Sequence, residues 1–236
     1  MLVGKLYLIP NIIADNTQDA VITSQVKSVL PGITNFLAED IRTARRFLSS
    51  LKIYDSIEAL HFEVLDKDTD PSVVPNLLAP LSEGIDMGVI SESGCPGIAD
   101  PGALAVRFAH ENNIQVIPLV GPSSILLALM GSGLNGQHFA FHGYLPIEAK
   151  EAEHTIRSLE KESRVKHQTQ VFIETPYRSN ALFQLLLRTL GSDTLLCVAE
   201  NLTGGNEMIK TAAVKKWRNT NKMLPKEPAV FLFLAI

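Results

Sequence analysis

Short apolar segments alternate with segments of helical spacing through the first half of the chain, and this alternation constrains the fold more than any other feature. Leu2–Ile9 is rich in β-forming residues and ends at Pro10, whereas Thr17–Leu30 has helical spacing before a Pro31-Gly32 break. Further strands are predicted at 33–38, 87–92 and 114–118, and further helices at 40–51, 76–84 and 100–113. Such alternation predicts βαβ units and a mostly parallel sheet.

The pattern restarts beyond Pro118. Helices are predicted at 123–130, 150–161 and 178–190, and strands near 138–144 and at 170–174, 194–200 and 228–236. Val171–Ile173 and Val230–Leu234 are apolar throughout, which is typical of central strands covered on both faces. A chain of 236 residues, 46% of them hydrophobic, can bury two cores. We therefore predict an α/β fold of two lobes, 1–118 with a mostly parallel sheet and 119–236 with a mixed sheet.

Charge and cysteine content exclude several classes of protein. The chain has 21 lysines and arginines against 25 aspartates and glutamates, a net charge of −4, which excludes a strongly basic nucleic-acid coat but permits a local basic patch. Cys95 and Cys197 stand about 100 residues apart without a C-x-x-C partner, so no disulfide framework or zinc knuckle is predicted. No signal-peptide pattern opens the chain, and no apolar run approaches the ~20 residues of a membrane span. A cytoplasmic protein is expected.

Two patterns that suggest other chemistry have the wrong context. Gly131–Gly136 matches G-x-G-x-x-G, but it follows a predicted helix and leads into a strand, the reverse of a dinucleotide-binding loop. A helix end and turn is the better interpretation. His138 and His142 have metal-ligand spacing for a helix, but the surrounding phenylalanines favour a strand, so no metal site is predicted.

A loop rich in glycine and proline marks a candidate ligand site. Ile90–Gly102 ends an apolar strand, contains three glycines and two prolines, and opens a helix. This places it at the carboxyl edge of a parallel sheet, where α/β proteins bind ligands through closely approaching main-chain groups. The alternative is an ordinary turn between strand and helix. Val120–Ser124 is a second loop of small residues and proline between a predicted strand and a predicted helix, although Ser123 also suits a helix N-cap.

Six segments in a fixed order carry a family resemblance. They are Tyr7–Pro10, Ala38–Arg42, Ser93–Gly102, Gly121–Ser123, Gly143–Pro146 and Glu200–Thr203. Together they resemble the tetrapyrrole methylase superfamily of S-adenosylmethionine-dependent methyltransferases. Within it, the chain looks most like the branch that methylates a cytidine 2′-hydroxyl in small-subunit ribosomal RNA.

The resemblance implies a fold, a cofactor and partners. It implies two α/β lobes with S-adenosylmethionine in the cleft between them, a homodimer, and ribosomal RNA or the small ribosomal subunit as the partner. The residues implied to contact the cofactor are Pro10, Ser93, Gly94, Cys95, Ile98, Gly121, Ser123, Ser124, Glu174 and Leu202. For Cys95 the implied contact is its backbone, and its thiol is incidental.

The chain departs from the usual motifs of that branch at several positions. The branch usually has P-x-G-N after its first strand, whereas here Pro10 is followed by Asn11-Ile12-Ile13. Ile41 replaces the threonine of A-E-D-T-R. In the glycine loop, Glu92 replaces an aspartate and Cys95 replaces a threonine. Asn201–Gly204 replaces the end of R-E-L-T-K. The motifs therefore support the cofactor site more strongly than the RNA substrate.

Basic and aromatic residues suggest where RNA would bind. Arg42, Arg45 and Arg46 fall on one face of a predicted helix, where they either hold phosphates or form a solvated surface. Tyr177 and Arg178 either stack on and pair with a nucleotide or form a capping turn.

Three carboxylates at strand ends are candidates for accepting the proton of a ribose hydroxyl. They are Glu39, Asp40 and Glu174, in that order, and each also suits a helix N-cap. Two rival functions remain open: methylation of a tetrapyrrole or a small metabolite, and cofactor or RNA binding without catalysis.

Overall fold

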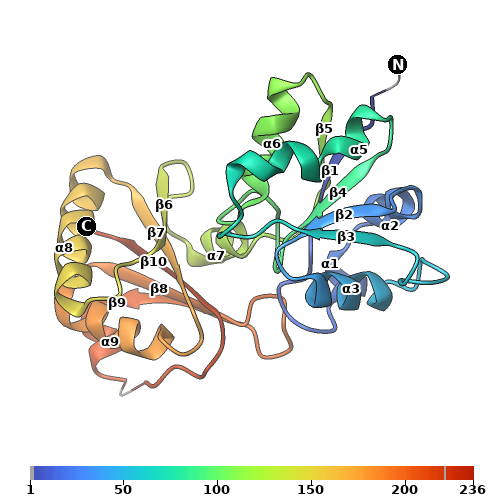
Figure 1. Ribbon diagram of the computed structural model, residues 1–236. Coiled ribbons are helices and arrows are strands. Elements are labelled where there is room, and N and C mark those ends of the chain that lie inside the picture. Colours follow the sequence, from blue (N-terminus) through green and yellow to red (C-terminus); the bar gives the residue numbers. More distant parts are fainter. Residues whose placement is uncertain (1–2, 221) are drawn as a thin grey trace. The chain divides into compact units, whose positions relative to one another are not determined.

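The computed structural model describes residues 3–220 and 222–236, so Leu2 of the first predicted strand lies outside the described residues. The chain separates into two compact units, Met1–Ser123 (unit 1) and Ser124–Ile236 (unit 2), each with its own sheet (Figure 1). The predicted lobes meet at 118/119. Within the described ranges no helix is long and apolar enough to cross a membrane.

Unit 1 is built on an all-parallel sheet, as the alternation of strands and helices predicts. Its strand order is β3-β2-β4-β1-β5. The strands are β1 (Leu6–Ile9), β2 (Asn35–Ala38), β3 (His61–Val64), β4 (Met87–Ile90) and β5 (Val116–Pro118). The helices are α1 (Gln18–Val21), α2 (Ser24–Val29), η1 (Leu30–Gly32), α3 (Ile41–Ser50), η2 (Pro71–Val73), α4 (Val74–Leu77), α5 (Ala79–Ser82) and α6 (Gly102–Glu111).

The two faces of this sheet pack into separate cores. Residues of α2 and α3 join β1 and β2 in one core, whereas residues of α4, α5 and α6 pack on the other face. The central strand β4 is buried at all four positions. A larger residue in place of Gly88 would displace its neighbours, because an added Cβ would lie 2.4 Å from the Ile9 Cδ1 atom.

Two predicted helices of unit 1 are wrong as continuous helices. The 17–30 segment divides into α1 and α2, because the Thr23 side chain accepts a hydrogen bond from the Val26 N–H and starts a new helix. The 76–84 segment divides into α4 and α5, which carry Pro75 and Pro80 in their first turns. A proline suits a first turn and cannot continue a preceding helix.

Unit 2 has a mixed sheet, as predicted. Its strand order is β6-β7-β10-β8-β9, in which only β6 and β7 pair in parallel. The strands are β6 (Phe139–Tyr144), β7 (Thr169–Glu174), β8 (Leu195–Glu200), β9 (Met208–Ala213) and β10 (Ala229–Leu234). The helices are α7 (Ser124–Ser132), α8 (Ala149–Lys166), α9 (Ser179–Thr189) and α10 (Val214–Arg218).

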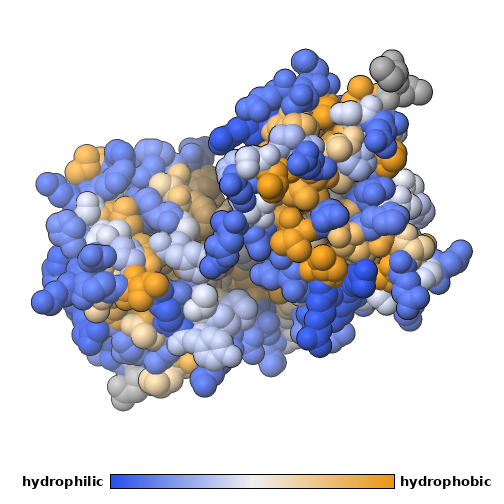
Figure 2. All heavy atoms as spheres, in the orientation of Figure 1, coloured by the Kyte–Doolittle hydropathy of each residue, from blue (hydrophilic) through white to orange (hydrophobic). Residues whose placement is uncertain are grey.

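Burial in unit 2 follows the apolar segments of the sequence. All six residues of β10 are buried, and Phe172 and Phe231 stack between β7 and β10. The outer side of the charged helix α8 is mostly hydrophilic (Figure 2). Gly131–Gly136 forms the end of α7 and the turn before β6, with Gly133 at φ +66°, which confirms the interpretation as a helix end.

Candidate functional site

A buried asparagine joins the loops that follow two neighbouring strands of unit 1. Asn11 lies directly after β1 and is 1% exposed. Its Nδ2 donates hydrogen bonds to the Ser91 carbonyl at 2.9 Å and the Glu92 carbonyl at 3.1 Å. Its backbone N–H donates to the Gly94 carbonyl at 2.8 Å. Because β1 and β4 pair in parallel, Asn11 fixes the 91–102 loop against the carboxyl end of β1.

The 91–102 loop is shaped by glycines and one aspartate. Gly94 and Gly97 have φ angles of +71° and +81°, in the left-handed region that glycine adopts without strain. Asp100 Oδ1 accepts hydrogen bonds from the Gly97 N–H at 2.5 Å and the Gly102 N–H at 2.8 Å. These contacts hold the main chain in a defined series of turns between β4 and α6. Ser93 and Ile98 are exposed on this loop.

The loop after β5 packs against the other two. A Cβ at Gly121 would lie 2.1 Å from the Pro10 Cβ, and one at Gly94 would lie 3.4 Å from the Pro122 carbonyl oxygen. The Cys95 thiol donates to that same carbonyl at 3.3 Å. The structure therefore brings four of the predicted cofactor residues, Pro10, Gly94, Cys95 and Gly121, to one edge of the parallel sheet.

Glu39 is the carboxylate whose surroundings suit proton transfer. It follows β2 directly, at the same edge of the sheet, and is half-buried. Burial, together with the negative charges of Asp100, Glu92 and Asp66, raises the pKa of Glu39 to about 7. A carboxylate with a pKa near the working pH is suited to act as a general base.

The neighbouring Asp40 has a structural role. Its Oδ1 accepts a hydrogen bond of 2.6 Å from the Thr43 N–H and caps α3. The hydrogen bonds from Thr43 lower the pKa of Asp40, and the nearby Arg42 and Arg46 act in the same direction. A carboxylate that is engaged in this way is a weak proton acceptor.

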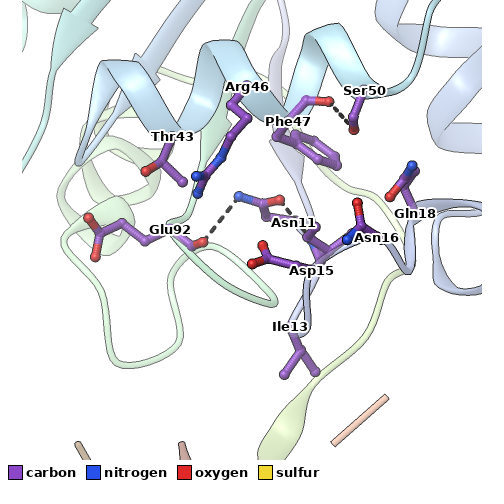
Figure 3. Close-up of a pocket in the computed structure, with 11 residues that line it drawn as sticks. Asn11, Ile13, Asp15, Asn16, Gln18, Thr43, Arg46, Phe47, Ser50 and Glu92 are labelled. Carbon is purple, nitrogen blue, oxygen red and sulfur yellow. Dashed lines mark hydrogen bonds between the residues drawn. The ribbon is translucent and has the colours of Figure 1, made fainter. Parts of the chain in front are cut away.

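The three arginines of α3 do not share one environment, although all are solvent-exposed. The Arg45 guanidinium lies over the Phe62 ring of β3, 5.2 Å from its centroid. Arg46 instead lines a pocket between α3 and the loop after β1 (Figure 3). Arg42 is near Asp40. Helical spacing predicted the shared face, but only the fold separates the three side chains.

Predicted site residues of unit 2 lie at the ends of its strands. The Glu174 carboxylate is fully buried, accepts a hydrogen bond from the Thr175 N–H at 2.8 Å, and pairs with Arg178 at 3.0 Å. Arg178 also donates to the Pro146 carbonyl at 3.4 Å. Tyr177 is 84% exposed, and the Lys226 ammonium lies 5.9 Å from its ring centroid.

A second buried carboxylate of unit 2 has a similar setting. Ala229 of β10 is paired with Glu174 of β7 on one side and with Glu200 of β8 on the other. The Glu200 carboxylate forms an ion pair with the Lys222 ammonium at 2.9 Å. These pairings favour a structural role for both carboxylates, so proton transfer by Glu174 stays a prediction. Leu202 is buried and Ser124 begins α7.

Comparison with known proteins connects the chain with ribosomal RNA methyltransferases. It is 32% identical over 211 residues to ribosomal RNA small subunit methyltransferase I of Escherichia coli O157:H7, covering 89% of this chain and 70% of that protein. The chain belongs to the ribosomal RNA small subunit methyltransferase I family. The proteins of the same name from Synechocystis and Vibrio cholerae are 32% identical over 220 residues and 30% over 205 residues. These alignments cover 92% and 87% of this chain, and 71% and 67% of the respective relatives.

Solved structures connect this methyltransferase I family member with the tetrapyrrole methylase fold. The methyltransferase CobJ matches with a TM-score of 0.64 at 16% identity, over 98% of this chain and 94% of that one. A uroporphyrin III C-methyltransferase from Thermus thermophilus matches with a TM-score of 0.59 at 16% identity, over 98% and 97% of the two chains. No family model matches the sequence.

These findings confirm the family resemblance and the two-sheet α/β fold predicted from the sequence. As a member of the methyltransferase I family, the chain is a methyltransferase. The sequence did not indicate that Asn11 joins two loops, although Asn11 stands close after a predicted strand as a departure from the usual motif. It also did not indicate that Asp100 holds the glycine loop. The roles of the individual site residues stay predictions.

Proposed function

We propose that this protein transfers a methyl group from S-adenosylmethionine to the 2′-hydroxyl of a cytidine ribose in small-subunit ribosomal RNA. The names of its relatives support the RNA substrate. The observation that carries the choice of a hydroxyl as acceptor is Glu39, a half-buried carboxylate with a pKa of about 7 at the carboxyl edge of the unit 1 sheet. We also propose that the protein acts as a homodimer in the cytoplasm.

The loops of unit 1 fit the proposed cofactor. Gly97 has no neighbouring atom within 4 Å of an added Cβ, and Gly94 has only the Pro122 carbonyl oxygen at 3.4 Å. The Gly94 carbonyl accepts from the Asn11 N–H, and the Gly97 N–H donates to Asp100, so these bonds hold the shape of the loop. The open space beside Gly97 lets a ligand that carries an ammonium, a carboxylate and ribose hydroxyls approach the main chain. When bound, S-adenosylmethionine supplies a methyl group that its sulfonium already activates.

The protein's part is then to orient the acceptor and to take its proton. In its ionised form, Glu39 would accept the hydroxyl proton as the hydroxyl oxygen takes the methyl group and the bond from that methyl to the sulfonium sulfur breaks. The base is protonated below pH 7 and ionised above it, because burial and three neighbouring carboxylates raise its pKa. We therefore expect the rate to rise with pH through this range.

This expectation gives a pH-dependent prediction. The acid limb of the kcat/KM profile should have an apparent pKa of about 7. Glu92→Gln removes one of the negative charges that raise the Glu39 pKa and should move that limb to lower pH. Because burial is the largest cause of the shift, we expect partial rather than full return to an ordinary carboxyl value. An unchanged limb in Glu92→Gln would contradict Glu39 as the titrating group.

A second prediction concerns the only cysteine in the glycine loop. Burial raises the pKa of the Cys95 thiol, followed by the charge of Asp100, which disfavours the nucleophilic thiolate. Cys95→Ala should therefore retain most methyl-transfer activity. Complete loss of activity in a folded Cys95→Ala protein that still binds S-adenosylmethionine would overturn the proposed mechanism.

The proposed function is tested by labelled methyl transfer. Purified protein is incubated with isotope-labelled S-adenosylmethionine and with small ribosomal subunits or tetrapyrrole precursors, and the digested RNA is analysed by mass spectrometry. Label in 2′-O-methylcytidine is the expected result. Label on a base atom or in the tetrapyrrole would contradict the proposal, as would cofactor binding without transfer to any acceptor. Sedimentation of the purified chain tests the homodimer.

A further inference from the structure

The pocket beside Glu39 has an arrangement of polar side chains that the methyl-transfer mechanism does not use. It lies between α3 and the 11–18 segment and has an empty volume of about 540 Å³, part of it open to solvent. Thr43 and Arg46 extend into it from α3, whereas Asp15, Asn16 and Gln18 come from the opposite loop (Figure 3).

The walls of the pocket are fixed by groups that are already paired. The side chain of Asn11 is already hydrogen-bonded: its Nδ2 donates to the carbonyls of Ser91 and Glu92, and its Oδ1 accepts from the Ile12 N–H. Phe47 is 3% exposed and belongs to the unit 1 core. Ile12 and Ile13 add apolar surface, and they stand where this chain departs from its family's motif. The scaffold is therefore firm, and part of its lining is apolar.

The polar side chains inside are not paired with protein. Among residues 3–220 and 222–236, the Arg46 guanidinium and the Asp15 carboxylate make no ion pair, and they lie on either side of Asn11 (Figure 3). The side-chain amides of Asn16 and Gln18 likewise make no hydrogen bond within that part of the chain. The pocket thus offers one cation, Arg46, two carboxylates, Asp15 and Glu92, and the two amides of Asn16 and Gln18.

This combination matches one class of ligand. A carboxylate accepts from an exocyclic amino group, amide N–H groups donate to ring nitrogen and carbonyl acceptors, and arginine pairs with phosphate. Cytosine presents an amino group next to a ring nitrogen and a carbonyl, whereas uracil lacks the amino group. The apolar isoleucine surface suits the face of a base.

We propose that this pocket holds the cytidine nucleotide whose ribose is methylated, with Asp15, Asn16 and Gln18 on the base edge and Arg46 on a phosphate. The proposal rests on the proposed function. The pocket adjoins the candidate base through Glu92, which lines the pocket and whose charge acts on Glu39. The residues that select the nucleotide and the residue that removes its proton would thus lie close together at one edge of the unit 1 sheet.

Direct binding tests the pocket without catalysis. Cytidine 5′-monophosphate and uridine 5′-monophosphate are titrated into ¹⁵N-labelled protein, and the side-chain amide signals of Asn16 and Gln18 are followed by NMR. We expect both signals to shift with the cytidine nucleotide, and about tenfold weaker binding of the uridine nucleotide. Absence of any shift at these amides, or equal affinity for both nucleotides, overturns the proposal.

Matched variants test the pocket in the reaction. Arg46→Ala and Gln18→Ala should each raise the KM for RNA about fivefold or more, with kcat and S-adenosylmethionine affinity little changed. Arg107→Ala and Gln25→Ala are the controls, because Arg107 is exposed on α6 and Gln25 is exposed on α2, both outside the pocket. Arg46→Ala should also reduce the steepness with which log K for RNA binding falls against log salt concentration, by up to about 0.7 in slope.

The outcomes separate this proposal from the proposed function. If wild-type protein methylates ribosomal RNA but Arg46→Ala behaves like Arg107→Ala, the pocket assignment is wrong and the function stands. If the cytidine nucleotide shifts the pocket amides but no RNA is methylated, the pocket is supported as a nucleotide site and the proposed function is wrong.

Discussion

Glu39→Gln should lower kcat by about 10²-fold or more, while the affinity for S-adenosylmethionine changes little. Glutamine keeps the size of the side chain and its hydrogen-bonding oxygen, but it cannot accept the proton of a ribose hydroxyl. Single-turnover methylation of small ribosomal subunits measures the rate, and calorimetry with S-adenosylmethionine measures the affinity. Glu58→Gln, an exposed carboxylate elsewhere in unit 1, is the charge-matched control.

The same variant has a stability signature that does not depend on activity. The Glu39 pKa is raised from 4.5 to about 7, so between these pH values the unfolded chain loses its proton while the folded protein keeps it. Stability therefore falls as pH rises through that window and changes no further above it. Glutamine removes this effect, so the Tm of Glu39→Gln relative to wild type should rise between pH 4.5 and pH 7. A constant difference across that range would contradict the raised pKa.

Asp40→Asn distinguishes the neighbouring candidate. Asp40 caps α3, and asparagine is an equally good N-cap, so this change should alter stability little and should affect turnover far less than Glu39→Gln. The reverse result, with Asp40→Asn inactive and Glu39→Gln active, would assign the base to Asp40.

Gly94→Val should weaken S-adenosylmethionine binding by about tenfold or more. Gly94 has φ +71°, which a β-branched residue adopts only with strain, and its Cβ would already lie 3.4 Å from the Pro122 carbonyl oxygen. A branched side chain would therefore distort the main chain that we assign to the cofactor. Calorimetry measures the loss of affinity, and circular dichroism establishes that the variant is folded.

Two further variants make this result interpretable. Gly94→Ala introduces the same backbone strain with a smaller side chain and should have an intermediate affinity. Gly32→Val is the matched control, because Gly32 has no positive φ and no atom within 4 Å of an added Cβ. Wild-type affinity in a folded Gly94→Val protein would remove the 91–102 loop from the cofactor site.

The central strands could be predicted from the sequence, as could the edge strands β5 and β6, whereas the edge strands β3 and β9 could not. β4 and β10 are buried throughout, so their apolar runs are visible without the fold. β3 and β9 lie at the edges of their sheets, and their residues are exposed or half-buried without a regular alternation, which leaves no clear pattern in the sequence. Strand formation there depends on pairing with β2 and β8, which is tertiary information.

The site divides in the same way. The glycine loop was predictable, because glycine and proline restrict the local backbone wherever they occur. The raised pKa of Glu39 was not, because it depends on burial and on the charges of Asp66, Glu92 and Asp100 from other loops. The separate environments of Arg45 and Arg46 likewise depend on Phe62 and on the 11–18 segment.

Asn11 has a consequence for how the proposed site moves. One side chain and its backbone N–H hold three carbonyl groups of a loop about 80 residues away, and water cannot easily replace them because Asn11 is 1% exposed. The loop after β1 cannot then separate from the loop after β4 without breaking all three hydrogen bonds at once. The two loops therefore open and close as a single body, so that a nucleotide which orders the 11–18 segment also steadies the glycines assigned to the cofactor.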